Sequence, residues 1–154
     1  MATISIGGNG TEPLSATVVI EYVDGSTESV SRQDQRFSIE FTGENVSVKG
    51  DVTGDIQAGG ELACGNVEGD VEAEGNIACG NVTGDVSAAG DVHCGAVTGD
   101  LQSEGDVSCG DVTGDLNAEG DVRCGAITGD ARAGGGIDCG SVSGDVEAGK
   151  SIDK

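Results

Sequence analysis

The 154-residue chain lacks tryptophan and contains only one tyrosine, two phenylalanines and one proline. All three aromatic residues precede position 50, so the remainder of the chain must build its core from small side chains. That remainder is rich in Gly, Val, Thr and Asp, which are poor helix formers, and it shows no 3.6-residue apolar stripe. We therefore expect an all-β protein.

Basic side chains are also scarce: seven Lys and Arg stand against 28 Asp and Glu, a net charge of −21. Nucleic acids and anionic membranes bind basic surfaces, so we expect neither as a partner. No apolar run is long enough to cross a membrane and the first ten residues do not resemble a signal peptide, which predicts a cytoplasmic protein.

The chain has a single histidine, His93. It occurs with no nucleophile–base pair, phosphate-binding loop or dinucleotide fingerprint. We predict a solvated surface histidine, no catalytic residues, no cofactor and no enzymatic activity.

Cysteine, in contrast, recurs at a fixed interval of fifteen residues: Cys64, Cys79, Cys94, Cys109, Cys124 and Cys139. The 105 residues from Gly50 to Lys154 are seven copies of one unit, Gly-x-Val-x-Gly-Asp-Val-x-Ala-x-Gly-Asp-Val-x-Cys. A short fixed period is typical of a solenoid, in which each repeat buries its apolar side only against its neighbours.

Three columns of glycine divide each unit and predict three corners, because glycine adopts the positive φ values that tight bends require. Between the corners, apolar and polar residues alternate with a period of two, as in Val71 and Ala73 or Ile77 and Cys79. The sequence predicts a three-sided parallel β-helix of seven 15-residue coils over residues 50–154.

The first 49 residues lack this repeat. Ala16–Val23 and Ser26–Ser31 flank an Asp24-Gly25 turn and predict a β-hairpin, and Arg36–Phe41 and Asn45–Lys49 predict two further strands. Terminal coils expose apolar ends and need a cap, so we interpret residues 1–49 as an N-terminal cap domain. An independent binding or assembly module is the alternative.

The last unit keeps the apolar pattern, but Lys150 replaces a corner glycine and Lys154 occupies the cysteine position. We expect no cap at this end, so strand edges and an apolar cross-section are open to another chain. This predicts a homo-oligomer, either a dimer or an end-to-end polymer. The candidate end-contact residues are Val142, Val146, Ala148 and Ile152.

The six cysteines are predicted to form an internal thiol ladder with rungs about 4.8 Å apart. That spacing permits disulfides, but in-register stacking keeps the side chains parallel, so we expect free thiols that pack as small hydrophobes. A line of sulfurs cannot supply the tetrahedron that structural zinc prefers. Two-coordinate soft metals such as Cu(I) could bridge neighbouring sulfurs, but no access path is evident, so we predict no metal here.

One acidic position is invariant across the units: Asp55, Asp70, Asp85, Asp100, Asp115, Asp130 and Asp145. A second, imperfect acidic column runs through Glu61, Asn76, Asp91, Asp106 and Asp121. Carboxylates about 4.8 Å apart repel by about 1 kcal/mol per pair in water, so something must offset the repulsion. We favour capping of turn N–H groups by each aspartate; a ladder of calcium sites is the alternative.

The stretch from Val48 to Leu62, VKGDVTGDIQAGGEL, resembles a coil of the bactofilins. The resemblance covers roughly residues 46–154. It implies a right-handed three-sided β-helix and a cytoskeletal or scaffolding protein that polymerises end to end without nucleotide. Our leading hypothesis is a non-enzymatic structural protein that self-associates through its ends; the alternative is a calcium-binding module that uses the stacked aspartates.

Overall fold

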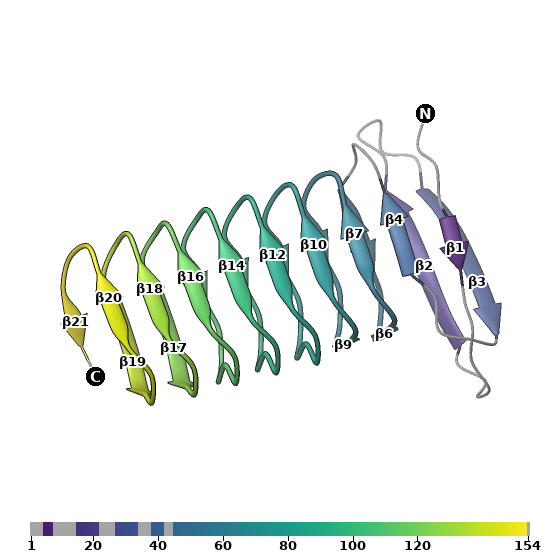
Figure 1. Cartoon of the computed structure of the whole chain (residues 1–154). Helices are drawn as coiled ribbons and strands as arrows, with labels where there is room; N and C mark the ends of the chain where they lie inside the picture. The colour runs from purple at the N-terminus through teal and green to yellow at the C-terminus, as the bar shows by residue number, and fades with distance from the viewer. Residues whose placement is uncertain (1–4, 8–14, 22–26, 34–37, 42–44, 154) are drawn as a thin grey trace.

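The computed structural model describes residues 5–7, 15–21, 27–33, 38–41 and 45–153. Every regular element in these ranges is a β-strand, and the strands wind into a straight rod with the two termini at opposite ends (Figure 1). The chain advances one layer along the rod for every fifteen residues. This confirms the predicted all-β solenoid of parallel 15-residue coils.

The first face of the rod is a nine-stranded sheet. In spatial order its strands are β1 (Ser5–Gly7), β4 (Ser38–Phe41), β7 (Ile56–Ala58), β10 (Val71–Ala73), β12 (Val86–Ala88), β14 (Leu101–Ser103), β16 (Leu116–Ala118), β18 (Ala131–Ala133) and β20 (Val146–Ala148). From β4 to β20 every neighbour is parallel, with register partners one unit apart from β7 onwards, such as Val71 opposite Val86. Only β1 runs antiparallel to its neighbour.

The second face is a ten-stranded sheet. Its strands, from the C-terminal end, are β21 (Ile152–Asp153), β19 (Ile137–Val142), β17 (Val122–Ile127), β15 (Val107–Ser108), β13 (Val92–His93), β11 (Ile77–Ala78), β8 (Leu62–Ala63), β5 (Val46–Val48), β2 (Ser15–Glu21) and β3 (Thr27–Gln33). The strands from β21 to β5 are parallel, whereas β2 is antiparallel to both β5 and β3.

The third face is narrower. It consists of β6 (Val52–Thr53) paired in parallel with β9 (Val67–Glu68), followed by single parallel bridges between one residue of each successive coil. Those bridges join Val67, Val82, Val97, Val112 and Ile127. This side of the coil holds one inward residue between two corners, so its ladders are short. In the last coils β17 and β19 continue around the corner onto this face, where Ile127 pairs with Val142. The rod thus has two broad faces and one narrow face.

The interior is a stack of small aliphatic side chains, as the alternation predicts. In β10, Val71 and Ala73 are buried and Glu72 between them is exposed, and the same pattern recurs in β12, β14, β16 and β18. Ser103 is the one buried polar residue among those described. Its hydroxyl donates to the Gly90 carbonyl at 2.8 Å and accepts from the Gly105 N–H at 3.1 Å, so its polarity is satisfied.

The glycine columns do mark three corners, but for a different reason from the one predicted. Among the described residues, positive φ is found only at Gly50 (126°) and Gly54 (119°). At most other corners the preceding coil lies too close for a side chain: a Cβ at Gly65 would lie 2.5 Å from the Gly50 carbonyl oxygen, and one at Gly80 would lie 2.5 Å from Asn66 Oδ1. Close approach of the preceding coil requires glycine at these positions, rather than a left-handed bend.

The predicted hairpin is present as β2 and β3, with Val18 opposite Val30. Its Asp24-Gly25 turn lies outside the described residues. Both further strands are found, as β4 and β5, although residues 36–37 are again outside the described ranges. The short strand β1 was not predicted, because three residues carry no alternation to detect. Parallel stacking begins at β4, ahead of the sequence repeat.

Candidate functional site: the corner ladders, the thiol ladder and the C-terminal coil

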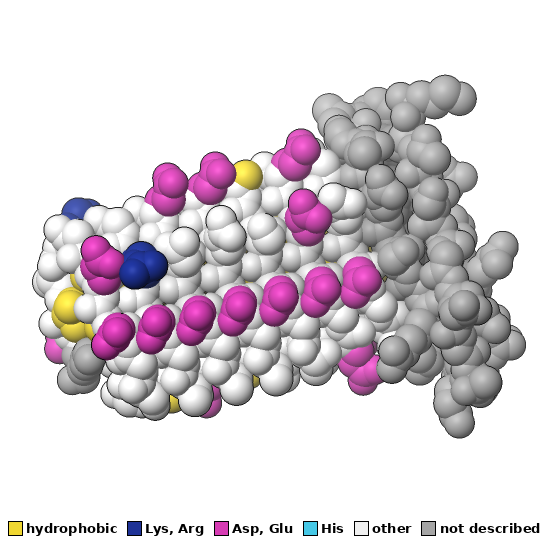
Figure 2. Space-filling view, in the orientation of Figure 1, with side chains coloured by type: hydrophobic (Ala, Val, Ile, Leu, Met, Phe, Trp, Pro, Cys, Tyr) yellow, Lys and Arg dark blue, Asp and Glu magenta, His cyan; other side chains and the backbone are white. Residues whose placement is uncertain are grey.

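The invariant aspartates form a hydrogen-bonded ladder along one edge of the rod (Figure 2). The carboxylate Oδ1 of each aspartate accepts a hydrogen bond from the backbone N–H of the aspartate one coil later, with N···O distances of 2.8–3.0 Å. The capping interpretation therefore applies between coils rather than within one turn. The N–H groups offset the repulsion between carboxylates, because each lies between two successive side chains.

The other two corners carry equivalent ladders. At one of them, Asp91 Oδ1 accepts from Asp106 N–H at 2.8 Å and Asp106 Oδ1 accepts from Asp121 N–H at 2.7 Å. At the third corner the acceptors are Asp51, Asn66, Asn81 and Asp111. The sequence did not reveal this ladder, because Ala96 and Ala126 interrupt the column of acceptors. The signal shared by the three ladders is an Asp or Asn directly after a corner glycine, which occurs in most units.

Asp121 is held more tightly than the other carboxylates of its ladder. The backbone N–H of Gly136 donates to its Oδ1 at 2.8 Å, and Lys150 Nζ lies 3.5 Å from the same oxygen. The hydrogen bond from Gly136 and, secondly, the charge of Lys150 lower the pKa of the Asp121 carboxyl. The lysine that replaces a corner glycine thus forms an ion pair across two coils.

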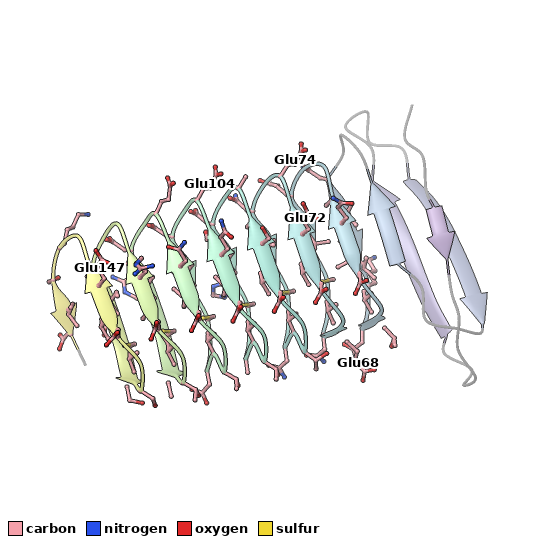
Figure 3. The ribbon with its side chains drawn as sticks, in the orientation of Figure 1. Glu68, Glu72, Glu74, Glu104 and Glu147 are labelled. Carbon is pink, nitrogen blue, oxygen red and sulfur yellow. The ribbon has the colours of Figure 1, made fainter. Side chains whose placement is uncertain are left out.

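The ladders do not gather carboxylates around a common centre. Oδ1 of each stacked aspartate already accepts a backbone N–H, and the side chains run in single file along the rod. The glutamates labelled in Figure 3 leave the rod at separate places and point away from one another. Within the described ranges, no three His, Cys, Asp or Glu side chains are grouped to hold an ion. The calcium ladder stays a prediction without a preformed site.

None of the six cysteines is joined in a disulfide, and together they form the predicted column along the edge of the core. Cys94 and Cys139 are buried, at 8% and 5% exposure, but the other four are only half-buried, so the ladder is more accessible than a lumen-filling column. Successive thiols are neighbours along the column, and each affects the pKa of the next.

This contact divides the thiols into two groups by acidity. Hydrogen bonds from the neighbouring thiols lower the pKa of Cys79 and Cys109. Hydrogen bonding to those sulfurs, together with burial, raises the pKa of Cys64, Cys94 and Cys124.

The C-terminal coil (residues 140–153) leaves its apolar residues uncovered. Ile152 is 46% exposed and is the one exposed large hydrophobic residue in the described part of the chain. Val142, Val146 and Ala148 are half-buried. The residues at the same four unit positions one coil earlier are at most 5% exposed: Ile127, Ala131, Ala133 and Ile137. The four predicted end-contact residues thus form one apolar end surface, bordered by the free edges of β20 and β21.

The first coil (residues 46–58) is covered, in contrast. Its apolar residues are between 0% and 5% exposed: Val46, Val48, Val52, Ile56 and Ala58. The sheets extend past this coil through β4 and β1 on one face and through β2 and β3 on the other. The antiparallel strands of the N-terminal segment therefore provide the cap that the C-terminal coil lacks among the described residues.

Three basic side chains near the C-terminal coil form ion pairs with carboxylates. Arg132 Nε lies 2.8 Å from Glu147 Oε2, and Arg123 Nε lies 4.0 Å from Asp138 Oδ2. Together with the Lys150–Asp121 pair, these contacts neutralise part of the acidic charge in the last coils. His93, on β13, is exposed on the outer surface as predicted.

No helix in the described ranges is long and apolar enough to cross a membrane. Comparison with known proteins finds no matching family model, curated protein or solved structure. The resemblance to bactofilins therefore depends on the coil pattern alone.

Proposed function

We propose that the chain is a non-enzymatic structural or scaffolding protein, bactofilin-like in its coil pattern, whose rod self-associates through the C-terminal coil. The observation that carries this proposal is the unequal burial of the two ends. Ile152 is 46% exposed, whereas Ile137 at the same unit position is 1% exposed and the first coil is fully covered. Burying an isoleucine or valine side chain contributes about 1.5–3 kcal/mol, so a second molecule gains by covering this surface.

The partner with the best fit is a second copy of the same coil. A two-fold axis perpendicular to the rod places the two end surfaces face to face and pairs the free edges in an antiparallel manner. In the part of the chain that the structure describes, only the C-terminal end surface is open, because β4 and β2 continue the two broad sheets past the first coil. We therefore expect a tail-to-tail dimer rather than a filament. A single coil offers a small interface, so we expect a weak complex.

The charge distribution favours the same arrangement. Two chains of net charge −21 repel each other, and contact at the tips keeps the acidic ladders of the two rods farther apart than lateral contact does. The ion-paired Arg132 and Lys150 lie near the contact. Because salt screens the remaining repulsion, association should strengthen as ionic strength rises.

Sedimentation velocity over a protein dilution series tests the proposal, at low and high salt and with calcium or a chelator. We expect a concentration-dependent dimer that Ile152→Asp abolishes. The matched control is Ser108→Asp, which adds the same charge at an exposed position of the same sheet, in β15. A monomer at every concentration and salt would contradict the proposal, as would a dimer that survives Ile152→Asp. Assembly that requires calcium would favour the alternative use of the aspartates.

A further inference from the structure

The thiol ladder has no part in the proposed dimer. Its rungs are fixed by the backbone: the N–H of Cys64 donates to the Ala78 carbonyl at 3.0 Å, and that of Cys79 donates to the His93 carbonyl at 3.0 Å. At the other end of the ladder, Cys124 and Cys139 are direct register partners in β17 and β19. Each cysteine therefore lies one inter-strand spacing, about 4.8 Å, from the next.

This spacing suits an ion between two sulfurs. A metal–thiolate bond is about 2.3 Å long in zinc sites, so two such bonds in line span about 4.6 Å. Residues in register in parallel strands project their side chains in the same direction, so the sulfurs of consecutive cysteines stand side by side at about this spacing. A linear, two-coordinate ion fits between consecutive rungs without displacing the backbone.

The ladder can also be reached from solvent. The thiols of Cys64, Cys79, Cys109 and Cys124 are half-buried rather than enclosed, and each is followed by a corner glycine that adds no side chain. An access path to the thiols is therefore present. Its apparent absence was the reason to predict no metal from the sequence.

We propose that consecutive cysteines of the ladder bind soft monovalent cations of the Cu(I) or Ag(I) type, one ion to each pair of sulfurs and three ions per chain. Binding replaces two S–H protons with two metal–sulfur bonds: two thiols and one cation give one S–M–S unit and release two protons. Thiolate ligands select such ions. Zinc is not retained, because each site offers two sulfurs and, within the described ranges, no third ligand is grouped with them.

Two double variants, each with four cysteines left, test whether the number of bound ions depends on adjacent cysteines or on the total number of thiols. Cys64→Ala with Cys139→Ala leaves four consecutive rungs, so we expect two ions. Cys79→Ala with Cys124→Ala leaves only Cys94 and Cys109 adjacent, so we expect one ion. Native mass spectrometry of the reduced protein titrated with Ag(I) gives the counts, against three ions in the parent chain. Circular dichroism checks that the variants keep the fold.

Equal ion counts in the two double variants would overturn the proposal, as would one ion per cysteine or no bound silver. Loss of two mass units per cysteine pair, without silver, would show disulfides instead and would also overturn it. If a double variant fails to fold, the single variant Cys64→Ala replaces it. We then expect two silver ions and one thiol that still reacts with a thiol reagent; five ions would contradict pairwise binding.

Discussion

The two ends of this rod are built from the same kind of sheet but meet solvent differently. At the N-terminal end the two broad sheets continue past the first coil, through β4 and β1 on one face and through the antiparallel β2 and β3 on the other, and Val52 in that coil is 0% exposed. At the C-terminal end the last parallel strands form the edge, and Ile152 is 46% exposed. A solenoid buries each coil only through its neighbour, so whatever lies beyond the last coil determines whether that coil is interior or surface.

The largest expected effect comes from removing the same side chain at the same unit position in two coils. Ile77→Ala creates a cavity in a covered coil and should lower the free energy of unfolding by about 2–5 kcal/mol. Ile152→Ala removes an already exposed side chain and should lower it by less than about 1 kcal/mol in the monomer. Urea unfolding at low protein concentration measures both. Equal losses would show that the C-terminal coil is as well covered as the interior.

The corner glycines allow a second comparison within one column. Gly80→Ala drives a Cβ to 2.5 Å from Asn66 Oδ1 and should cost about 1–3 kcal/mol of stability. Gly140→Ala brings its Cβ no closer than 3.5 Å to the Gly125 carbonyl oxygen and should be nearly neutral.

Asn66→Ala combined with Gly80→Ala provides the control for this comparison, because it removes the atom that the new Cβ meets. The double variant should recover part of the loss relative to the sum of the single variants. Thermal or urea unfolding measures these losses. If the loss in free energy of unfolding for the double variant equals the sum of the two single losses, the Asn66 side chain does not require glycine at position 80.

A smaller effect is expected in the invariant aspartate ladder. Asp100→Ala removes the acceptor of the Asp115 N–H, which it binds at 2.8 Å, and should cost about 1 kcal/mol. Asp145→Ala, in the last rung, removes a carboxylate to which no described N–H donates, so we expect little change in monomer stability. Urea unfolding measures the stability of the two variants. A larger loss of stability for Asp145→Ala than for Asp100→Ala would contradict the inter-coil role of the ladder.

The smallest effect concerns pH. The pKa of Asp121 is lowered in the folded chain, so its contribution to stability is present above the pKa of the unfolded chain and is lost as pH falls through the folded pKa. Lys150→Gln should raise this pKa only part of the way back, because the Gly136 N–H is the main cause. Carboxyl NMR titration of the two proteins measures it. An unchanged pKa would show that the ion pair does not form in solution.

The period-two alternation and the fixed repeat were sufficient to predict the fold. They placed Val71, Ala73, Ile77 and Val82 in the core and indicated Ile152 as an end residue, and the structure agrees on each. These inferences succeeded because each unit repeats the same choice, so a local preference becomes a column.

What the sequence could not provide are contacts that cross from coil to coil. The reason for the corner glycines lies in atoms of the preceding coil, such as Asn66 Oδ1 beneath Gly80. The third corner ladder was missed because alanines interrupt it, and the exposure of the thiols was missed because alternation predicts the side of a strand rather than the distance to a corner. The strand β1 is too short to show a pattern, and its place is fixed by pairing with β4.

The most direct test of the unequal ends is small-angle X-ray scattering of the associated species after size separation. Tail-to-tail contact through the C-terminal coil predicts a dimer whose maximum dimension is about twice that of the Ile152→Asp monomer. Its cross-sectional radius should be unchanged. A dimer of the same length with a larger cross-section would show lateral association, and would contradict the claim that the open coil is the contact surface.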